Sequence, residues 1–178
     1  MVRISSTNFD EVYPIWANHL WKGRKSGIEP TNPIRFGGGY DKKLLLADPF
    51  FFKAVDDRSQ RIVGVISGFA THDNGFRLRG VYVDPYYRGL GIANKLTARI
   101  IKLGEVMGRD FVWTLARQET MGFYQRLGFE QTSNWINHEV EFGPNCFMSL
   151  PLHSERFELV LQYHFWNQSF SGNQSFER

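Results

Sequence analysis

Cysteine and long apolar runs are almost absent from this sequence, and each absence excludes a class of protein. Cys146 is the only cysteine, which excludes an internal disulfide and a cysteine-rich zinc site and fits a reducing compartment. No apolar run approaches the roughly 20 residues that span a bilayer. The first residues, Met1–Ser5, lack the apolar core of a signal peptide. We therefore expect a soluble cytoplasmic protein with no membrane partner.

Metal-binding and nucleotide-binding motifs are missing as well. The five histidines are scattered, without a pair at metal-ligand spacing, so we expect no metal. The sequence has no Gly-Lys-Ser/Thr of a P-loop and no Gly-x-Gly-x-x-Gly after its first strand. A net charge of +3 is a mild surplus, and no stripe of basic residues interleaved with aromatics accompanies it. We expect no nucleic-acid partner, although the surplus suits an anionic ligand.

Periodicity and turn residues divide the chain into strands and helices. Apolar patterns predict strands at 2–6, 50–56, 61–71, 76–84, 111–116, 129–136 and 146–152. Helical spacing predicts helices at 9–21, 42–47, 91–107 and 119–127. The first helix is capped by Asn8 or else starts at Pro14, and Asn74-Gly75 favours a type I′ hairpin turn. The order indicates an α/β (α+β) fold with a mixed, mostly antiparallel central sheet of six or seven strands flanked by helices.

The length of 178 residues suits one full-sized domain and is too short for two. We assign that domain to residues 1–152. Residues 153–178 are interpreted as a C-terminal extension with one expected helix at 154–162.

The stretch from Val81 to Ala93 has the features of a phosphate-binding loop. A strand ends at Pro85, an arginine and two glycines follow, and a long helix starts at once. Glycines let backbone N–H groups converge on a ligand, and a helix N-terminus adds unpaired donors and the positive end of its dipole. Arg88 either supplies charge to a phosphate or closes off the loop. The pattern indicates a pyrophosphate site, against the alternative of a glycine-rich turn that only starts a helix.

Two motifs resemble those of the Gcn5-related N-acetyltransferase (GNAT) family. Arg88, Gly91 and Ala93 stand on the fixed positions of its Arg/Gln-x-x-Gly-x-Gly/Ala signature. Further along the chain, Gly122–Phe129 is similar to the family's Phe-Tyr-x-x-x-Gly-Phe element. The resemblance covers residues 50–150 well. It implies an acyl-CoA N-acyltransferase fold, acetyl-CoA as the cosubstrate, and no metal.

The resemblance also implies a mechanism and a set of site residues. The neutral acceptor amine attacks the thioester of acetyl-CoA directly, and the coenzyme leaves as a thiolate. Strand 76–84 separates from strand 111–116 and holds the pantetheine arm, while the loop binds the pyrophosphate. Tyr124 stands where many members place a general acid, with plain packing of its ring as the alternative. The cofactor-binding residues so implied are Val81, Tyr82, Val83, Arg88, Gly89, Leu90, Gly91, Ile92 and Ala93.

The sequence departs from the family pattern at two places. Many relatives carry a glutamate on the strand that corresponds to 76–84, and here that strand offers none. His72, Asp73, Glu119 or a water molecule held by backbone carbonyls are the alternatives for a general base. Arg117 stands where an asparagine is often found, and it either contacts the coenzyme phosphates or is a solvated residue at a strand end.

The acceptor amine is left open between a small molecule and a protein. Glu139 and Glu141 would attract a cationic acceptor such as a lysine, a polyamine or an aminoglycoside, or they are simply the exposed side of a hairpin. Two other functions stay open: a catalytically weak module that binds acetyl-CoA, and an acetyltransferase that acts on charged transfer RNA. A homodimer also stays open.

Overall fold

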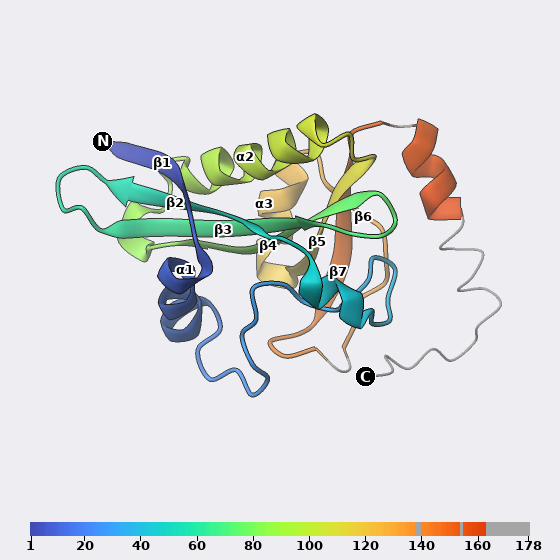
Figure 1. Ribbon diagram of the computed structural model, residues 1–178, viewed down its shortest axis with the longest axis horizontal. Helices are drawn as coiled ribbons and strands as arrows, with labels where there is room; N and C mark the ends of the chain where they lie inside the picture. Colours follow the sequence, from blue (N-terminus) through green and yellow to red (C-terminus); the bar gives the residue numbers. More distant parts are fainter. Residues whose placement is uncertain (138–139, 154, 163–178) are drawn as a thin grey trace.

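The computed structural model describes residues 1–137, 140–153 and 155–162, which form one mixed sheet with helices on both faces (Figure 1). Across the sheet the strands follow the order β1-β2-β3-β4-β5-β7-β6. The strands are β1 (Val2–Thr7), β2 (Phe50–Asp56), β3 (Ile62–Ala70), β4 (Gly75–Val83), β5 (Phe111–Arg117), β6 (Glu130–Gln131) and β7 (Asn145–Pro151). The helical segments are α1 (Phe9–Ile15), η1 (Trp16–Leu20), η2 (Lys42–Leu46), η3 (Pro85–Tyr87), α2 (Ile92–Val106), η4 (Gln118–Thr120) and α3 (Met121–Arg126).

All neighbouring strands are antiparallel except β4 and β5, which are parallel and connected through α2. The predicted fold class, a mixed and mostly antiparallel sheet flanked by helices, is therefore confirmed. α2 and α3 pack on one face of the sheet, where Leu96, Ile100 and Tyr124 join the main core. α1 and η1 cover the other face, where Val12 and Trp16 are buried (Figure 1).

A second aromatic core covers β5 and β7 on the same face as α1. Phe36, from the long segment between η1 and η2, packs against Phe111 with ring centroids 4.8 Å apart. Phe157, from the helical residues 155–162, packs against Phe111 at the same centroid distance of 4.8 Å. The described part of the expected extension is thus packed on the sheet. Residues 154 and 163–178 lie outside the described residues, and the boundary between 152 and 153 stays a prediction.

Two local expectations are wrong, the long strand at 129–136 and the type I′ turn, and of the two alternatives for the start of the first helix the Asn8 cap is confirmed. The strand expected at 129–136 is only Glu130–Gln131, because the Ser133 hydroxyl accepts a hydrogen bond from the Phe147 N–H at 2.9 Å and replaces a backbone carbonyl there. Pro14 lies inside a helix that starts after Asn8, whose side chain accepts a hydrogen bond from the Glu11 N–H at 3.1 Å. The type I′ turn is absent because Gly75 already belongs to β4.

No helix of the described residues is long and apolar enough to span a membrane.

Candidate functional site

β4 and β5 pair over only three residues before they separate. Their parallel register runs from Gly75 opposite Phe111 to Arg77 opposite Trp113. β4 nevertheless continues to Val83 and β5 to Arg117. Beyond Arg77 the two strands therefore leave a gap in the ladder, where backbone groups of β4 are not taken up by β5. This is the V-shaped opening that the sequence analysis expected.

β4 also carries a bulge beside this opening. Val65 of β3 pairs with Tyr82 and Ser67 pairs with Arg79, so Gly80 and Val81 together face a single β3 residue. Gly80 has a φ of 69°, in the left-handed region. Its carbonyl accepts a hydrogen bond from the Trp16 indole N–H at 2.8 Å. A bulge leaves one residue of the strand unpaired in the ladder, here between β3 and β4.

Alanine at position 80 is expected to lower the free energy of unfolding by roughly 2–5 kcal/mol. Its Cβ would lie 2.3 Å from Trp16 Cζ2, and the backbone would stay in the left-handed region. Gly39→Ala is the matched control, because Gly39 has a φ of 78° but no atom within 4 Å of a Cβ. In Gly39→Ala the free energy of unfolding should fall by only roughly 1–2 kcal/mol, which is the cost of placing alanine in the left-handed backbone region. Urea unfolding of both variants tests this, and equal losses would contradict the clash with Trp16.

The glycine loop that follows β4 starts α2 without a capping side chain. Gly89 and Gly91 both have left-handed φ angles, 77° and 72°. A Cβ on either glycine would have no atom within 4 Å, so the loop surface is open. Gly91 stands at the N-cap of α2 and makes no side-chain hydrogen bond to the first turn. The N–H groups of that turn are therefore available to an anion.

The side chains of the loop mostly support its shape. The Arg88 Nε donates to the Val83 carbonyl at 3.1 Å, which agrees with a role in closing off the loop; the predicted contact of Arg88 with a phosphate stays a prediction. Ile92 is buried in the main core and Ala93 packs against it, which anchors the first turn of α2. Leu90 is 63% exposed beside the loop.

The three implied residues at the end of β4 divide between the two faces of the sheet. Val81 and Val83 pack on the α2 face, and Val81 lines the cavity described below. Tyr82 lies on the opposite face, where its ring stacks on His19 with centroids 5.4 Å apart. The Tyr82 side chain therefore lies on the face opposite α2, and only the backbone of Tyr82 could contribute to coenzyme binding along β4.

Tyr124 on α3 reaches the same opening. Its ring packs against Phe129 with centroids 5.6 Å apart, and the side chain is 7% exposed. Burial raises the pKa of Tyr124 to about 12, against a smaller opposing effect of a hydrogen bond with Thr114 on β5. The side chain lines the cavity and keeps its proton at neutral pH. A proton donor that is both buried and adjacent to a cavity meets the needs of a general acid.

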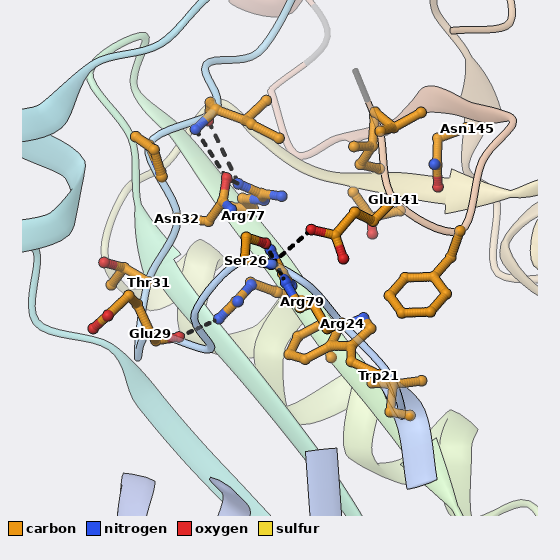
Figure 2. Close-up of a pocket in the computed structure, with 18 of the residues that line it drawn as sticks. Trp21, Arg24, Ser26, Glu29, Thr31, Asn32, Arg77, Arg79, Glu141 and Asn145 are labelled. Atoms are coloured by element: carbon orange, nitrogen blue, oxygen red, sulfur yellow. Dashed lines mark hydrogen bonds between the residues drawn. The ribbon is translucent and has the colours of Figure 1, made fainter. Parts of the chain in front are cut away.

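A cavity of about 890 Å³ lies at the opening between β4 and β5. Its walls come from β4, β5, the segment that follows η1, and residues 140–145 (Figure 2). Its volume is within the range of sites for small molecules. Figure 2 shows Asn32 beside Arg77, and Glu141 beside Ser26. The cavity thus brings together segments that are far apart in the sequence.

Glu141, one of the two glutamates expected to attract a cationic acceptor, already forms hydrogen bonds with backbone N–H groups. Its carboxylate accepts hydrogen bonds from the N–H groups of Lys25 and Ser26 at 2.8 and 2.9 Å. It therefore connects the last loop to the segment after η1. Glu139 lies outside the described residues.

The alternatives for a general base do not reach the cavity. The His72 Nε2 lies 2.9 Å from a carboxylate oxygen of Asp41, and Asp73 accepts hydrogen bonds from Thr71 and from the Gly75 N–H. Neither of them, nor Glu119, is among the residues that line the cavity. A water molecule held by the protein stays as the alternative for the base. Among the described residues, no group of three His, Cys, Asp or Glu side chains is arranged to hold a metal ion.

Arg117 is not a solvated strand-end residue. It lines the cavity, its guanidinium lies 4.9 Å from the Phe142 ring centroid, and it donates to the Leu20 carbonyl at 3.5 Å. Arg77 and Arg79, which stand on the strand where no glutamate was found, also line the cavity and were not predicted as site residues from the sequence. The sequence did carry a signal for these two site residues. Arginines seldom lie within a buried strand, and here two of them alternate with the apolar residues Phe76 and Leu78.

Comparison with known proteins agrees with this architecture. Residues 47–131 match the family model described as an acetyltransferase (GNAT) domain. No curated protein matches the sequence.

Among solved structures, an acetyltransferase of the GNAT family from Staphylococcus aureus Mu50 is 19% identical with a TM-score of 0.60, covering 85% of this chain and 99% of its own. The ribosomal-protein-S18-alanine N-acetyltransferase from Escherichia coli is 18% identical with a TM-score of 0.60, covering 86% and 95%. A Bacillus anthracis protein, solved in complex with acetyl coenzyme A, is 16% identical with a TM-score of 0.52, covering 59% and 63%. At these identities the structures share the fold.

Proposed function

Because this chain is a member of the GNAT acetyltransferase family, we propose that it transfers the acetyl group of acetyl-CoA to a primary amine. The neutral amine attacks the thioester carbon, a C–N bond forms, and the C–S bond breaks to release coenzyme A. The amine gives up one proton to solvent, the leaving sulfur gains one from Tyr124, and Tyr124 regains its proton from solvent. The observation that carries this proposal is the opening between β4 and β5, with a cavity at its mouth and the glycine loop at the end of β4.

The coenzyme binds along β4 and over the start of α2. The uncapped N–H groups of residues 89–93 and the helix dipole bind the pyrophosphate. Backbone groups of β4 beyond Arg77 bind the pantetheine arm as they would bind an added strand. The bulge at Gly80 and Val81 supplies a donor for the thioester oxygen. The Bacillus anthracis relative, which shares the fold and was solved with acetyl coenzyme A, supports this choice of cosubstrate.

Tyr124 acts as the general acid. A thiolate that leaves in a buried site gains from a proton donor within reach, and general acid catalysis contributes roughly 10²- to 10⁴-fold in rate. The pKa of Tyr124, raised by burial to about 12, keeps the phenol protonated at the pH where amines react, so its proton is available although the phenol is a weaker acid than an exposed one. The hydrogen bond with Thr114 orients the hydroxyl from β5.

An assay of thiol release tests the proposal. The protein is incubated with acetyl-CoA and a panel of primary amines that includes amino acids, phosphorylated amines, polyamines, lysine peptides, aminoglycosides and charged transfer RNA. We expect release of free coenzyme A that depends on one class of amine, with turnover on the order of 1–10³ s⁻¹, and an acetylated product of matching mass. Cys146 does not interfere with the thiol reagent, because it is fully buried and burial raises its pKa to about 11.

A reaction without amine gives the background of hydrolysis. Binding of acetyl-CoA without thiol release for any amine would favour the alternative function, a module that holds the coenzyme as a ligand. Release that depends on charged transfer RNA alone would favour the other alternative.

A further inference from the structure

Arginines dominate the polar lining of the cavity. Four of them line it, from three separate parts of the chain: Arg24, Arg77, Arg79 and Arg117. Among the described residues, the carboxylates in the lining are Glu29 and Glu141, and the Glu141 carboxylate already accepts two backbone hydrogen bonds from the segment after η1. The cavity therefore has an excess of positive charge, which Figure 2 shows at Arg24, Arg77 and Arg79.

Arg77 and Arg79 are buried without a carboxylate partner. Each side chain is 5% exposed, and no ion pair involves either within the part of the chain that the structure describes. Arg77 donates to the Asn32 side-chain oxygen at 3.1 Å, and Arg79 donates to the Glu29 carbonyl at 2.8 Å. The Arg77 Nε and the Arg79 Nη2 have no hydrogen-bond partner. Removing a charge from water without a counter-ion costs several kcal/mol, so a bound anion would stabilise both guanidiniums.

Aromatic rings replace part of the lost hydration. The Arg79 guanidinium lies 4.9 Å from the Trp16 ring centroid and 4.6 Å from that of Trp21. The Arg77 guanidinium lies 4.8 Å from the Trp113 centroid. Such contacts stabilise a cation by roughly 0.5–2 kcal/mol each and neutralise no charge. They hold the two guanidiniums in place, as a preformed site for an anion requires.

The arginines also repel one another. Burial and, to a smaller extent, the charge of Arg24 lower the pKa of Arg77 to about 9. Burial and, to a smaller extent, the charges of Arg77 and Arg24 lower the pKa of Arg79 well below its ordinary value, and the charge of Glu29 opposes this shift only in part. A bound anion in the cavity would relieve this repulsion and could accept charge-assisted hydrogen bonds from the arginines that line it.

We propose that the acceptor is a small amine that carries a carboxylate or phosphate group, which the arginines of the cavity bind. This inference rests on the proposed function and names its substrate class. Arg77 is the last β4 residue paired with β5, and Arg79 directly precedes the bulge, so an anion bound by them holds the rest of the molecule at the opening. The sequence-based idea of a cationic acceptor is not favoured, because the excess charge of the cavity would repel it.

Matched pairs of amines test the inference. Each pair differs in the anionic group alone: γ-aminobutyrate against its carboxamide, and phosphoethanolamine against ethanolamine, with spermidine as the cationic comparison. We expect kcat/KM to be at least about a hundredfold higher for the anionic member of one pair, since charge-assisted contacts of buried arginines are worth that much. The pair that shows the preference identifies carboxylate or phosphate. Equal or higher kcat/KM for the neutral and cationic amines would overturn the inference and leave acetyl transfer itself intact.

Variants of Arg24 link the preference to the cavity. Arg24 lies on a loop and is only partly buried, so Arg24→Gln should fold normally. It should raise the KM for the preferred anionic amine by about tenfold and leave the dissociation constant of acetyl-CoA unchanged. Arg24→Lys keeps the charge and should retain most of the preference. Arg3→Gln, which removes the same charge from an exposed site on β1, is the control and should change neither value.

Equilibrium binding keeps the inference testable if no amine is acetylated. Calorimetric titration of γ-aminobutyrate and phosphoethanolamine into the protein, with coenzyme A present, measures anion binding without turnover. Binding of one of them that weakens in Arg24→Gln and persists in Arg3→Gln would support the anion site even if the proposed function fails. Absence of binding for both anionic amines would overturn the site.

Discussion

Gly91→Val is expected to weaken the binding of acetyl-CoA by at least about a hundredfold, the loss of several charge-assisted hydrogen bonds. Gly91 stands at the N-cap of α2 with a φ of 72°, and no atom lies within 4 Å of a Cβ built on it. The open space above the loop is where the pyrophosphate binds in our account. A valine side chain would fill that space, and a β-branched residue strongly disfavours the left-handed backbone that directs the N–H groups. Calorimetric titration of acetyl-CoA measures the effect.

Gly108→Val is a matched control on the same helix. Gly108 follows the C-terminal end of α2, has a φ of 66°, and likewise has no atom within 4 Å of a Cβ. The two substitutions therefore impose similar backbone strain at opposite ends of one helix. We expect similar losses in the free energy of unfolding but unchanged coenzyme affinity for Gly108→Val. If Gly91→Val binds acetyl-CoA as tightly as Gly108→Val does, the phosphate loop is wrongly assigned.

Tyr124→Phe is expected to lower kcat by about a hundredfold and to leave the dissociation constant of acetyl-CoA nearly unchanged. The substitution removes the hydroxyl and keeps the ring, which packs against Phe129 in the main core. The fold should therefore be retained while the proton donor is lost. Because the pKa of Tyr124 is raised to about 12, the wild-type rate should not fall between pH 8 and pH 10 through ionisation of this phenol. Steady-state kinetics across that range measures both effects.

Two further variants separate chemistry from packing. Thr114→Val removes the hydroxyl that holds Tyr124 and should lower kcat less than Tyr124→Phe does. Tyr13→Phe removes a phenol from α1, where the side chain is 46% exposed, and should leave kcat unchanged. Unchanged kcat in Tyr124→Phe would reduce its role to packing, which is the alternative that the sequence left open.

Local rules explain why much of the fold could be predicted from sequence. Leu96 and Ile100 recur at helical spacing and are fully buried under α2, and the cap at Asn8 forms as expected. The glycine loop could be located because Gly89 and Gly91 are needed for left-handed backbone angles, a requirement that is visible in one short stretch. The errors lie where a side chain from elsewhere decides the outcome, as when Ser133 takes a strand hydrogen bond from Phe147.

The chemistry of the cavity could not be predicted in the same way. Its segment after η1 is rich in glycine and proline and carries no periodic signal. Arg24, Arg79 and Glu141 are far apart in the sequence and line the same cavity only because the chain folds. The excess of positive charge is therefore visible only in the folded structure. For this reason the two arginines of β4, Arg77 and Arg79, were not predicted as site residues from the sequence.

A crystal structure of the protein with acetyl-CoA tests the central claim most directly. The account predicts the pyrophosphate within hydrogen-bond distance of the N–H groups of residues 89–93, and the pantetheine arm between β4 and β5. It also predicts the thioester sulfur next to the Tyr124 hydroxyl, with the acetyl group facing the arginine-lined cavity. A coenzyme bound away from the loop, or a sulfur out of reach of Tyr124, would contradict it.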